Sequence, residues 1–373
     1  MRSVATTNGK NQVRVHNHQA PTRRANGMAL TIKDIAERAG VSSGTVSKVL
    51  NDAPGVGAET RIRIRKLVEE LDYEPNALAQ GLAARRTGNI GVIVPHTGSY
   101  FMGSTYWPIL LTSVAEQAAA RGLNVVLSTA RADGDAESAY RSLLKGRKVD
   151  GVVVGSEHFG LRQHTELLLK GIPFVMVGRA PLLPHYCIDA DNVGGGRTMA
   201  RHLLGLGHRR IAMVTGPVWH PASVDRAKGF SDAVEEAGLE PIVTRSEFRL
   251  DAAMRDVRET LEREPRPTAL CLAAGDLVTA GLRVAESIGL RVPLDLAVVV
   301  FDDHPLYMHF APPITAVDQP IYEMGVAAVE MLLTLMDGKV PEAPHPLLPT
   351  RLVVRSSCGA KLANLAFASG HPN

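Results

Sequence analysis

The sequence predicts an α/β protein with an all-α N-terminal head, a hinge helix and a two-lobed body that contains parallel sheets. The head is predicted from apolar residues that recur at helical spacing through residues 31–71. The body is predicted because, from Asn89 onward, short apolar runs alternate with amphipathic stretches, as in parallel strands covered by helices. With 373 residues, 45% of them hydrophobic, the chain is long enough to bury a core in each part.

Residues 31–50 (TIKDIAERAGVSSGTVSKVL) indicate two short helices joined by a glycine turn. The apolar residues of the first helix have the spacing i, i+3, i+4, i+7: Ile32, Ile35, Ala36 and Ala39. Thr31 stands three residues before Asp34, so its hydroxyl can cap the first turn. Gly40 supplies the left-handed backbone that ends this helix, and Ser42 begins the second one. The pattern predicts a helix-turn-helix, whose second helix can enter the major groove of DNA.

A third helix is predicted over residues 58–71, with Ile62, Leu67 and Leu71 packed on the first two helices. Residues 77–84 can form a short further helix, the hinge helix. In the body, two successive sets of strands and helices predict two similar lobes with a cleft between the carboxyl ends of their strands.

Two further features of the body bear on its chemistry. The long helix predicted over residues 324–335 is placed in the second lobe. The triplet Gly194–Gly196 lacks the Lys-Ser/Thr of a phosphate-binding loop, so we expect it to begin a helix that packs against a strand. The sequence contains no recognisable catalytic motif, and we expect no enzymatic activity, no metal and no cofactor.

The net charge of +3 is unevenly distributed. Residues 1–88 contain 14 Lys or Arg and 8 Asp or Glu, whereas the remainder contains 27 basic and 30 acidic residues. A basic head on a mildly acidic body is typical of a module that binds phosphate groups. Residues 1–27 are polar and are interpreted as an over-extended gene start, with a basic DNA-tracking arm as the alternative.

The cellular location is expected to be the cytoplasm. No run reaches the about 20 apolar residues of a membrane helix, and residues 1–27 lack the apolar segment of a secretion signal. The three cysteines are widely spaced, and buried thiols in a reducing compartment are the interpretation.

Three segments in order, TIKDIAERAGVSSGTVSKVLN, YEPNALAQGLA and NIGVIVP, resemble the lactose-repressor/galactose-repressor (LacI/GalR) family of bacterial transcription regulators. The resemblance continues through DNVGGGRTMARHLLGLGHRRIAMVTGP and GLRVPLDLAVVVFDDHPLYMHFAPPITAVDQP to about Arg355. It implies a ligand-responsive, sequence-specific regulator, most often a repressor, with a body like that of periplasmic binding proteins. It also implies a homodimer on a pseudo-palindromic DNA operator, with the helix at 324–335 adding to the dimer interface.

The chain is accordingly divided into five parts. They are a disordered basic extension (1–28), a helix-turn-helix DNA-binding domain (29–75), a hinge helix and linker (76–88), a two-lobed ligand-binding and dimerisation domain (89–355) and a C-terminal tail (356–373).

The resemblance places base readout at Ser43, Gly44 and Lys48, and a minor-groove wedge at Leu82 of the hinge helix. The first two positions leave little direct readout, whereas Lys48 can donate to guanine O6 and N7. The other candidate DNA contacts position the head on phosphates or cap its helices: Thr31, Ser42, Thr45, Ser47, Asn51, Asn76 and Arg85. The alternatives are serines that only cap and solvate the helix, and a Leu82 that packs between hinge helices.

For the cleft, the resemblance implies that Arg226 and Asp302 form a charged clamp for hydroxyl or carboxylate groups of an effector. Aromatic contacts with the effector are expected from Tyr106, Trp107 and Phe248. The alternatives are core packing for the aromatic residues and a structural ion pair for Arg226 and Asp302. A small carbohydrate is the expected effector, and a nucleobase is second.

Two departures from the family pattern bear on the cleft. Val300 stands before Phe301 where the family usually has glycine, so its side chain is expected to reshape the pocket floor. Residues 96–107 differ from the commoner asparagine-containing loop. The alternative functions are a solute-binding protein for sugar transport without a DNA role, and an enzyme on the same fold. The head argues against the first, and the missing catalytic motifs argue against the second.

Overall fold

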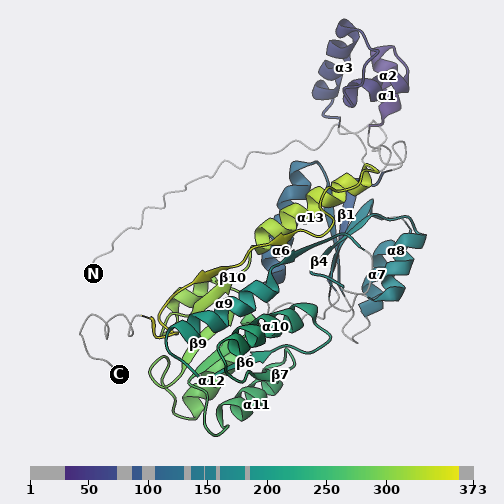
Figure 1. Cartoon of the computed structure of the whole chain (residues 1–373). Coiled ribbons are helices and arrows are strands. Elements are labelled where there is room, and N and C mark those ends of the chain that lie inside the picture. The colour runs from purple at the N-terminus through teal and green to yellow at the C-terminus, as the bar shows by residue number, and fades with distance from the viewer. Residues whose placement is uncertain are drawn as a thin grey trace, which may run out of the picture. The chain divides into compact units, whose positions relative to one another are not determined.

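The computed structural model describes residues 30–73, 86–94, 106–129, 136–146, 148–156, 160–180 and 185–360. The chain divides into two compact units, residues 1–85 and residues 86–373, both drawn in Figure 1. The predicted hinge helix, with Asn76, Leu82 and Arg85, lies outside the described residues, and so does the predicted extension at 1–28. No helix in the described part of the chain is long and apolar enough to cross a membrane.

Three short helices form the first unit: α1 (Ile32–Ala39), α2 (Ser43–Leu50) and α3 (Ala58–Glu70). Their shared core contains Ile35, Val46 and Ile64, which are fully buried. Gly40 has φ 65° and ψ 36°, so it turns the chain from α1 towards α2 in the left-handed region that glycine adopts without strain. The predicted helix-turn-helix is confirmed.

The predicted inner face of α3 is wrong at one position. Ile62 is 69% exposed, whereas Ile64 is fully buried. With about 100° of rotation per residue, Ile64, Leu67 and Leu71 share one face of the helix, and Ile62 lies about 200° from Ile64. Leu67 and Leu71 pack against the core as predicted.

The second unit contains two six-stranded sheets. The strands of the first sheet are β1 (Asn89–Val94), β2 (Asn124–Thr129), β3 (Gly151–Gly155), β4 (Phe174–Val177), β5 (Cys187–Ala190) and β11 (Leu347–Leu348). Their order is β11-β5-β4-β3-β1-β2, and all neighbours are parallel.

The strands of the second sheet are β6 (Ile211–Thr215), β7 (Ile242–Arg245), β8 (Ala269–Leu272), β9 (Ala297–Phe301), β10 (Thr315–Asp318) and β12 (Arg351–Val353). Their order is β12-β10-β9-β8-β6-β7, and β12 is antiparallel to β10. Without β11 and β12, both sheets have the doubly wound order 2-1-3-4-5, so the two lobes share one topology.

Helices cover both faces of each sheet (Figure 1). On the first sheet, α6 (Tyr106–Ala120) and α13 (Ile321–Met336) pack on one face, and α7 (Ala136–Leu144) and α8 (Leu161–Leu169) on the other. On the second sheet, the two pairs are α9 (Asn192–Gly205) with α10 (Pro221–Glu236), and α11 (Leu250–Leu261) with α12 (Val278–Ser287). The alternation of strands and helices predicted from the sequence is confirmed.

The chain crosses between the lobes in a way that the sequence did not predict. It leaves the first sheet after β5 into α9, returns from β10 to α13, and crosses again between β11 and β12. The placement of the helix at 324–335 in the second lobe is therefore wrong, because Met324, Ala328 and Leu332 pack on the first sheet. Strands β5, β10, β11 and β12 were not predicted, because none of them contains an apolar run of more than two or three residues.

Helices α9 and α10 pack with their backbones in contact because glycines lie at the crossing. A Cβ on Gly229 would stand 1.8 Å from a carbonyl oxygen of α9, and one on Gly196 would stand 2.0 Å from the carbonyl oxygen of Arg226. Gly195 faces β9, where a Cβ would approach the ring of Phe301 to 2.5 Å. The expectation that this glycine triplet begins a helix packed against a strand is confirmed.

We expect Gly229→Ala to destabilise the second unit by about 1–3 kcal/mol or more, because the new Cβ overlaps backbone and would force α9 and α10 apart. Gly205→Ala is the matched control, since a Cβ there meets nothing within 4 Å and alanine favours the helix. Thermal and urea denaturation of the full chain measure both variants. An unchanged unfolding midpoint for Gly229→Ala would contradict this account of the crossing.

Candidate functional site

Side-chain hydrogen bonds fix both ends of α2. Ser42 caps the helix by accepting the N–H of Thr45 at 3.1 Å, and the two hydroxyl oxygens lie 2.9 Å apart. At the other end, the side-chain amide of Asn51 donates to the carbonyl oxygen of Ser47 at 3.0 Å. These bonds occupy part of the hydrogen-bonding capacity of the candidate DNA contacts Ser42, Thr45 and Asn51.

Thr31 and Asp34 form the cap at the start of α1. The hydroxyl of Thr31 donates to the carboxylate of Asp34 at 2.7 Å, and the backbone N–H of Thr31 donates to the same oxygen at 2.8 Å. The buried carboxylate of Asp34 is thus the acceptor at this helix end, while Thr31 stays on the surface. Together these bonds form a capping box, so the predicted cap by Thr31 is confirmed.

The outer face of α2 presents few large side chains. Among its candidate DNA contacts, the exposed residues are Ser42, Gly44 and Lys48. The half-buried ones are Ser43, Thr45 and Ser47. A Cβ on Gly44 would meet only the hydroxyl oxygen of Ser42, at 3.7 Å, so packing within the unit does not require glycine there. Lys48 is the long cationic side chain of this face.

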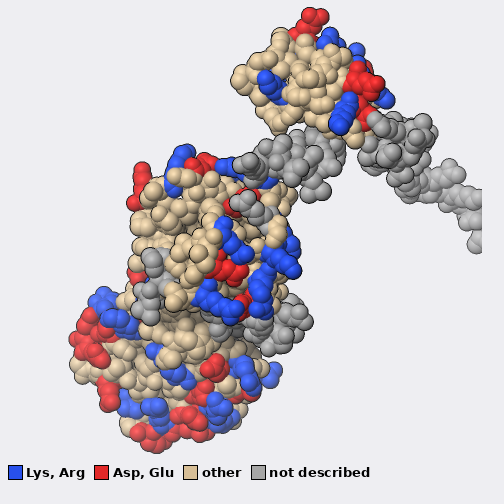
Figure 2. All heavy atoms as spheres, turned by 90° about the vertical axis from the view of Figure 1, so that its right-hand side faces the viewer, with Lys and Arg blue, Asp and Glu red and all other residues tan. Residues whose placement is uncertain are grey.

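The described residues of the first unit do not carry the basic surplus that the sequence places in the head. Residues 30–73 contain seven Lys or Arg and seven Asp or Glu. Figure 2 shows both kinds together on the visible face of this unit. Asp52, for example, pairs with Arg61 at 3.2 Å and with Arg65. The surplus of residues 1–88 is contributed by basic residues outside 30–73, five of them within 1–29.

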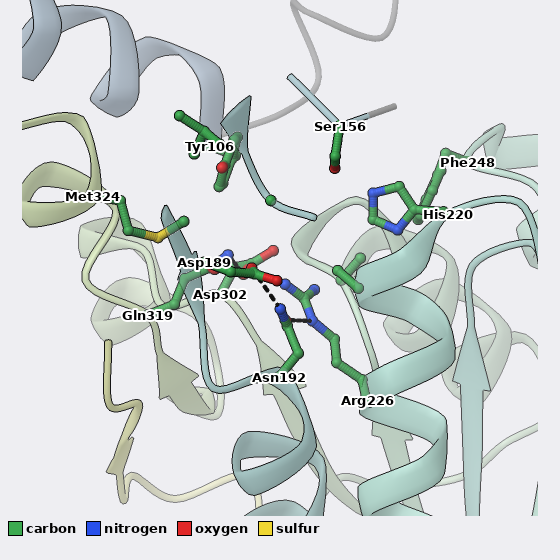
Figure 3. A pocket seen from close by; sticks show the side chains of 14 residues that line it. Tyr106, Ser156, Asp189, Asn192, His220, Arg226, Phe248, Asp302, Gln319 and Met324 are labelled. Carbon is green, nitrogen blue, oxygen red and sulfur yellow. Dashed lines mark hydrogen bonds and ion pairs between the residues drawn. The ribbon is translucent and has the colours of Figure 1, made fainter. Parts of the chain in front are cut away.

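A cavity lies in the second unit at the carboxyl ends of strands from both sheets (Figure 3). The space between its lining atoms amounts to about 560 Å³, part of which is open to solvent. The first lobe contributes Tyr106, Ser156, Val177, Gly178, Asp189 and Met324. The second lobe contributes Asn192, His220, Ala222, Arg226, Phe248, Ala274, Asp302 and Gln319. This is where doubly wound sheets bind ligands.

Arg226, on α10, is 5% exposed and is held from several sides. Its Nε donates to the amide oxygen of Asn192 at 2.8 Å, and its Nη1 donates to the carbonyl oxygen of Ala273 at 2.8 Å. Nη2 lies 3.7 Å from the carboxylate of Asp302, and the guanidinium carbon lies 3.7 Å from the ring centroid of Phe301. The guanidinium is therefore oriented before any ligand arrives.

Asp302 follows β9 with φ 74°, a left-handed backbone conformation that is strained for a residue with a Cβ. Its carboxylate accepts from the side-chain amide of Gln319 and from the N–H of Gly275 at 3.4 Å. The ion pair considered as the alternative for Arg226 and Asp302 is present, and both side chains also line the cavity (Figure 3).

Asp189, in β5, brings a second carboxylate to the cavity. Burial raises the pKa of this carboxyl to about 6, although the N–H of Ala190, which donates at 2.8 Å, works in the opposite direction. The side-chain amide of Asn192 donates to Asp189 at 3.0 Å. Asn192 thereby bridges Asp189 of the first lobe and Arg226 of the second (Figure 3).

The aromatic residues predicted for the cleft divide into two groups. Tyr106 and Phe248 line the cavity, and Phe248 contacts the ring of His220 with centroids 5.2 Å apart. Trp107 is 1% exposed and packs in the core between α6 and the first sheet, so its placement in the cleft was wrong. Neighbouring side chains on a helix point about 100° apart, so Tyr106 faces the cavity while Trp107 turns inward.

The departure at Val300 does not change the pocket floor. Val300 is fully buried in the core beneath α11 and α12 and does not line the cavity. Successive residues of a strand face opposite sides, so Phe301 points the other way and lies under Arg226. The second departure, over residues 96–107, lies mostly outside the described residues.

A second ion pair joins the lobes and was not predicted. Arg179 follows β4 of the first sheet, and Asp225 lies on α10 of the second lobe. Nε of Arg179 donates to one carboxylate oxygen at 2.7 Å and Nη2 donates to the other, which is the strong bidentate arrangement. Asp225 is 6% exposed, and its hydrogen bond raises the pKa of Arg179.

Several polar cavity residues were missed by the sequence analysis: Ser156, Asp189, Asn192, His220 and Gln319. Asp189 and Asn192 lie at the end of β5, and Gln319 follows β10, two strands that were not predicted. A polar residue directly after a short apolar run is the signal that would have found them, because the carboxyl ends of parallel strands meet at one edge.

We expect Arg179→Met to destabilise the second unit by about 1–3 kcal/mol, because Asp225 would lose its bidentate partner while remaining buried. Arg201→Met is the control, since Arg201 is exposed and pairs with a half-exposed Glu236; its effect should stay within about 0.5 kcal/mol. Urea denaturation of the full chain measures both. Equal losses in the two variants would contradict the buried-partner explanation.

Comparison with known families finds two matches in this chain. Residues 31–76 match the family described as "Bacterial regulatory proteins, lacI family", and residues 200–358 match the "Periplasmic binding protein-like domain". The HTH-type transcriptional regulator CelR of Thermobifida fusca is 34% identical over 333 residues, covering 88% of this chain and 98% of the relative.

Solved structures agree over the same length. A transcriptional regulator CelR–cellobiose complex has a TM-score of 0.69 at 34% identity, covering 88% of this chain and 99% of that chain. The lac repressor dimer bound to operator and an anti-inducer has a TM-score of 0.76 at 27% identity, covering 89% of this chain and 99% of that chain.

Proposed function

This chain belongs to the lacI family of bacterial regulatory proteins. We propose that it is a repressor that binds a pseudo-palindromic operator as a homodimer and responds to a small carbohydrate in the cleft of its body. The observation that carries the proposal is the cleft, where an oriented guanidinium and two carboxylates share one cavity with two aromatic rings. We place its action in the cytoplasm and assign it no enzymatic reaction.

The proposed DNA contacts follow from the outer face of α2. Lys48 is the candidate for direct base readout, since it is exposed and long enough to donate to guanine. Gly44 lets the backbone of α2 approach the groove closely. The remaining candidates contact phosphates or hold the helix: Thr31, Ser42, Ser43, Thr45, Ser47 and Asn51. Specificity then depends largely on DNA shape and on the hinge helix. In that helix, Asn76 is the cap, Leu82 inserts into the minor groove and Arg85 contacts a phosphate.

The chemistry of the cleft favours a neutral polyol. Asp189 and Asp302 accept hydrogen bonds and Arg226 donates them, so sugar hydroxyls can satisfy both kinds of group. Two carboxylates beside one guanidinium disfavour an anionic ligand. The faces of Tyr106 and Phe248 suit the apolar C–H faces of a sugar ring. The solved CelR complex carries cellobiose, which supports the same class of effector here.

The link between cleft and operator is proposed to be lobe closure. An effector that touches Asp189 in the first lobe and Arg226 in the second stabilises one arrangement of the lobes. The hinge segment leads directly into β1 of the first lobe, so a shift of that lobe changes whether the two hinge helices of a dimer can fold side by side. Two distinct sites then act on one two-state element, which is allostery.

We expect Arg226→Lys to weaken effector binding by about 10–100-fold, because lysine keeps the charge but cannot reproduce the fork that bonds Asn192 and Ala273 while facing the cavity. A thermal-shift panel of sugars and nucleobases on the full chain identifies the effector, and calorimetry then measures its affinity. Lys228→Met, an exposed change on the same helix, is the control. An unchanged effector affinity in Arg226→Lys would contradict the assignment of Arg226 to the effector pocket.

We expect Lys48→Met to weaken operator binding by about 1–3 kcal/mol and to relax specificity at one base pair of each half-site. Lys33→Met, an exposed change on α1, is the control for the loss of one positive charge. Fluorescence anisotropy on operators mutated one base pair at a time measures both. Equal losses on all sequences would show that Lys48 meets phosphate instead of a base.

The proposed function as a whole is tested by selection from random DNA followed by gel shift at moderate salt. The expected result is a palindrome whose half-sites are about one helical turn apart. If the chain selects no sequence but still binds a sugar, the runner-up, a solute-binding protein without a DNA role, replaces the proposal.

A further inference from the structure

Two histidines and a cysteine converge at the edge of the first sheet, away from the cleft. His185 and Cys187 are two residues apart at the start of β5, where the carbonyl oxygen of Tyr186 accepts the N–H of Met176 in β4 at 2.8 Å. Residues two apart on an extended chain point to the same side. Cysteine and histidine in this pattern are typical ligands of zinc-like metals.

The third residue, His345, comes from a distant part of the sequence. The N–H of Cys187 donates to the carbonyl oxygen of Pro344 at 3.0 Å, which aligns the segment before β11 with β5. This pairing brings Nδ1 of His345 to 3.3 Å from Sγ of Cys187. One ligand atom from each of His185, Cys187 and His345 can be chosen so that all lie within 4.8 Å of one another.

These distances approach those of a tetrahedral site. Zinc bond lengths place a sulfur and a nitrogen ligand about 3.6 Å apart, and two nitrogen ligands about 3.3 Å apart. Cys187 and His345 already stand at this separation, and the exposed side chain of His345 is free to adjust its rotamer. His185 Nε2 accepts the N–H of Ala180 at 3.4 Å, a long bond whose loss on coordination costs little.

The surroundings suit a soft or borderline-soft cation. Cys187 is 4% exposed, so a metal ion would supply the positive charge that a buried thiolate needs. A hollow lined by Leu167, Phe174 and Leu335 borders both histidines and leaves room for a water ligand. The set contains no carboxylate oxygen, so Mg²⁺ and Ca²⁺ do not fit it.

We propose that His185, Cys187 and His345 form a binding site for one zinc-class transition-metal ion per chain, with a water as the fourth ligand. On binding, the thiol proton leaves to solvent and the thiolate and two neutral imidazoles coordinate the ion. The ion ties β5 to the segment that leads into β11. Because β5 also carries Asp189 and the crossing into the second lobe, the metal stiffens the frame of the cleft.

The test uses the full chain, stripped with a chelator and titrated with Co²⁺ as a spectroscopic stand-in for Zn²⁺. The expected result is one Co²⁺ per chain, the visible bands of a tetrahedral centre, a thiolate-to-cobalt charge-transfer band, and displacement of all of them by Zn²⁺. Zn²⁺ is also expected to raise the melting temperature. Neither DNA nor effector is needed, so the outcome is independent of the proposed function.

Variants assign the signal to the three residues. Cys187→Ser removes the charge-transfer band, and His345→Gln, a change at an exposed position, lowers metal affinity by at least about tenfold. Cys358→Ser and His309→Gln are the controls and leave the titration unchanged. His16→Gln with His18→Gln also leaves it unchanged, since that pair offers no thiolate.

Two results would overturn the proposal. One is a titration without a charge-transfer band; the other is a Zn²⁺ affinity that His345→Gln leaves unchanged. In either case the contact between Cys187 and His345 is a hydrogen bond and nothing more.

Discussion

The cleft depends on the burial of one guanidinium. A buried cation is stable only where its charge and its N–H groups are matched. Arg226 meets this condition through Asn192, Ala273, Asp302 and the ring of Phe301. These partners come from α9, β8, β9 and the loops after them, so the requirement fixes how the second lobe is assembled. Helices α9 and α10 approach so closely that no space is left for a Cβ where α9 meets the carbonyl oxygen of Arg226. This close approach places Asn192 beside the guanidinium.

The same network connects the lobes. The side chain of Asn192 accepts a hydrogen bond from Arg226 and donates one to Asp189, which belongs to the first sheet. Arg179 and Asp225 make a second connection close by. The chain itself crosses at this level, so strand ends, covalent crossings and polar bridges all lie around one cavity. A ligand that replaces these bridges or adds to them changes which arrangement of the two lobes is the more stable one. This change is the physical basis for the proposed response at the operator.

The sequence predicted what depends on local pattern. The helix-turn-helix followed from apolar spacing and Gly40, and the long strands followed from their valine and isoleucine runs. It missed what depends on pairing between distant segments. The four-residue strands β5 and β10 have no pattern of their own, so Asp189, Asn192 and Gln319 were overlooked and the helix at 324–335 was put on the wrong lobe. Trp107 and Ile62 were misplaced because residue type alone does not say which way a helix faces.

The central claim is that the cleft and the operator are coupled through the lobes. The direct measurement is a calorimetric titration of the sugar selected by the thermal-shift panel into the free chain and into the chain saturated with its operator. The account predicts that the two affinities differ by about fivefold or more, and that the ratio equals the factor by which the sugar changes operator affinity. Identical sugar affinities in the two titrations would contradict it, because a ligand that binds both states equally shifts neither.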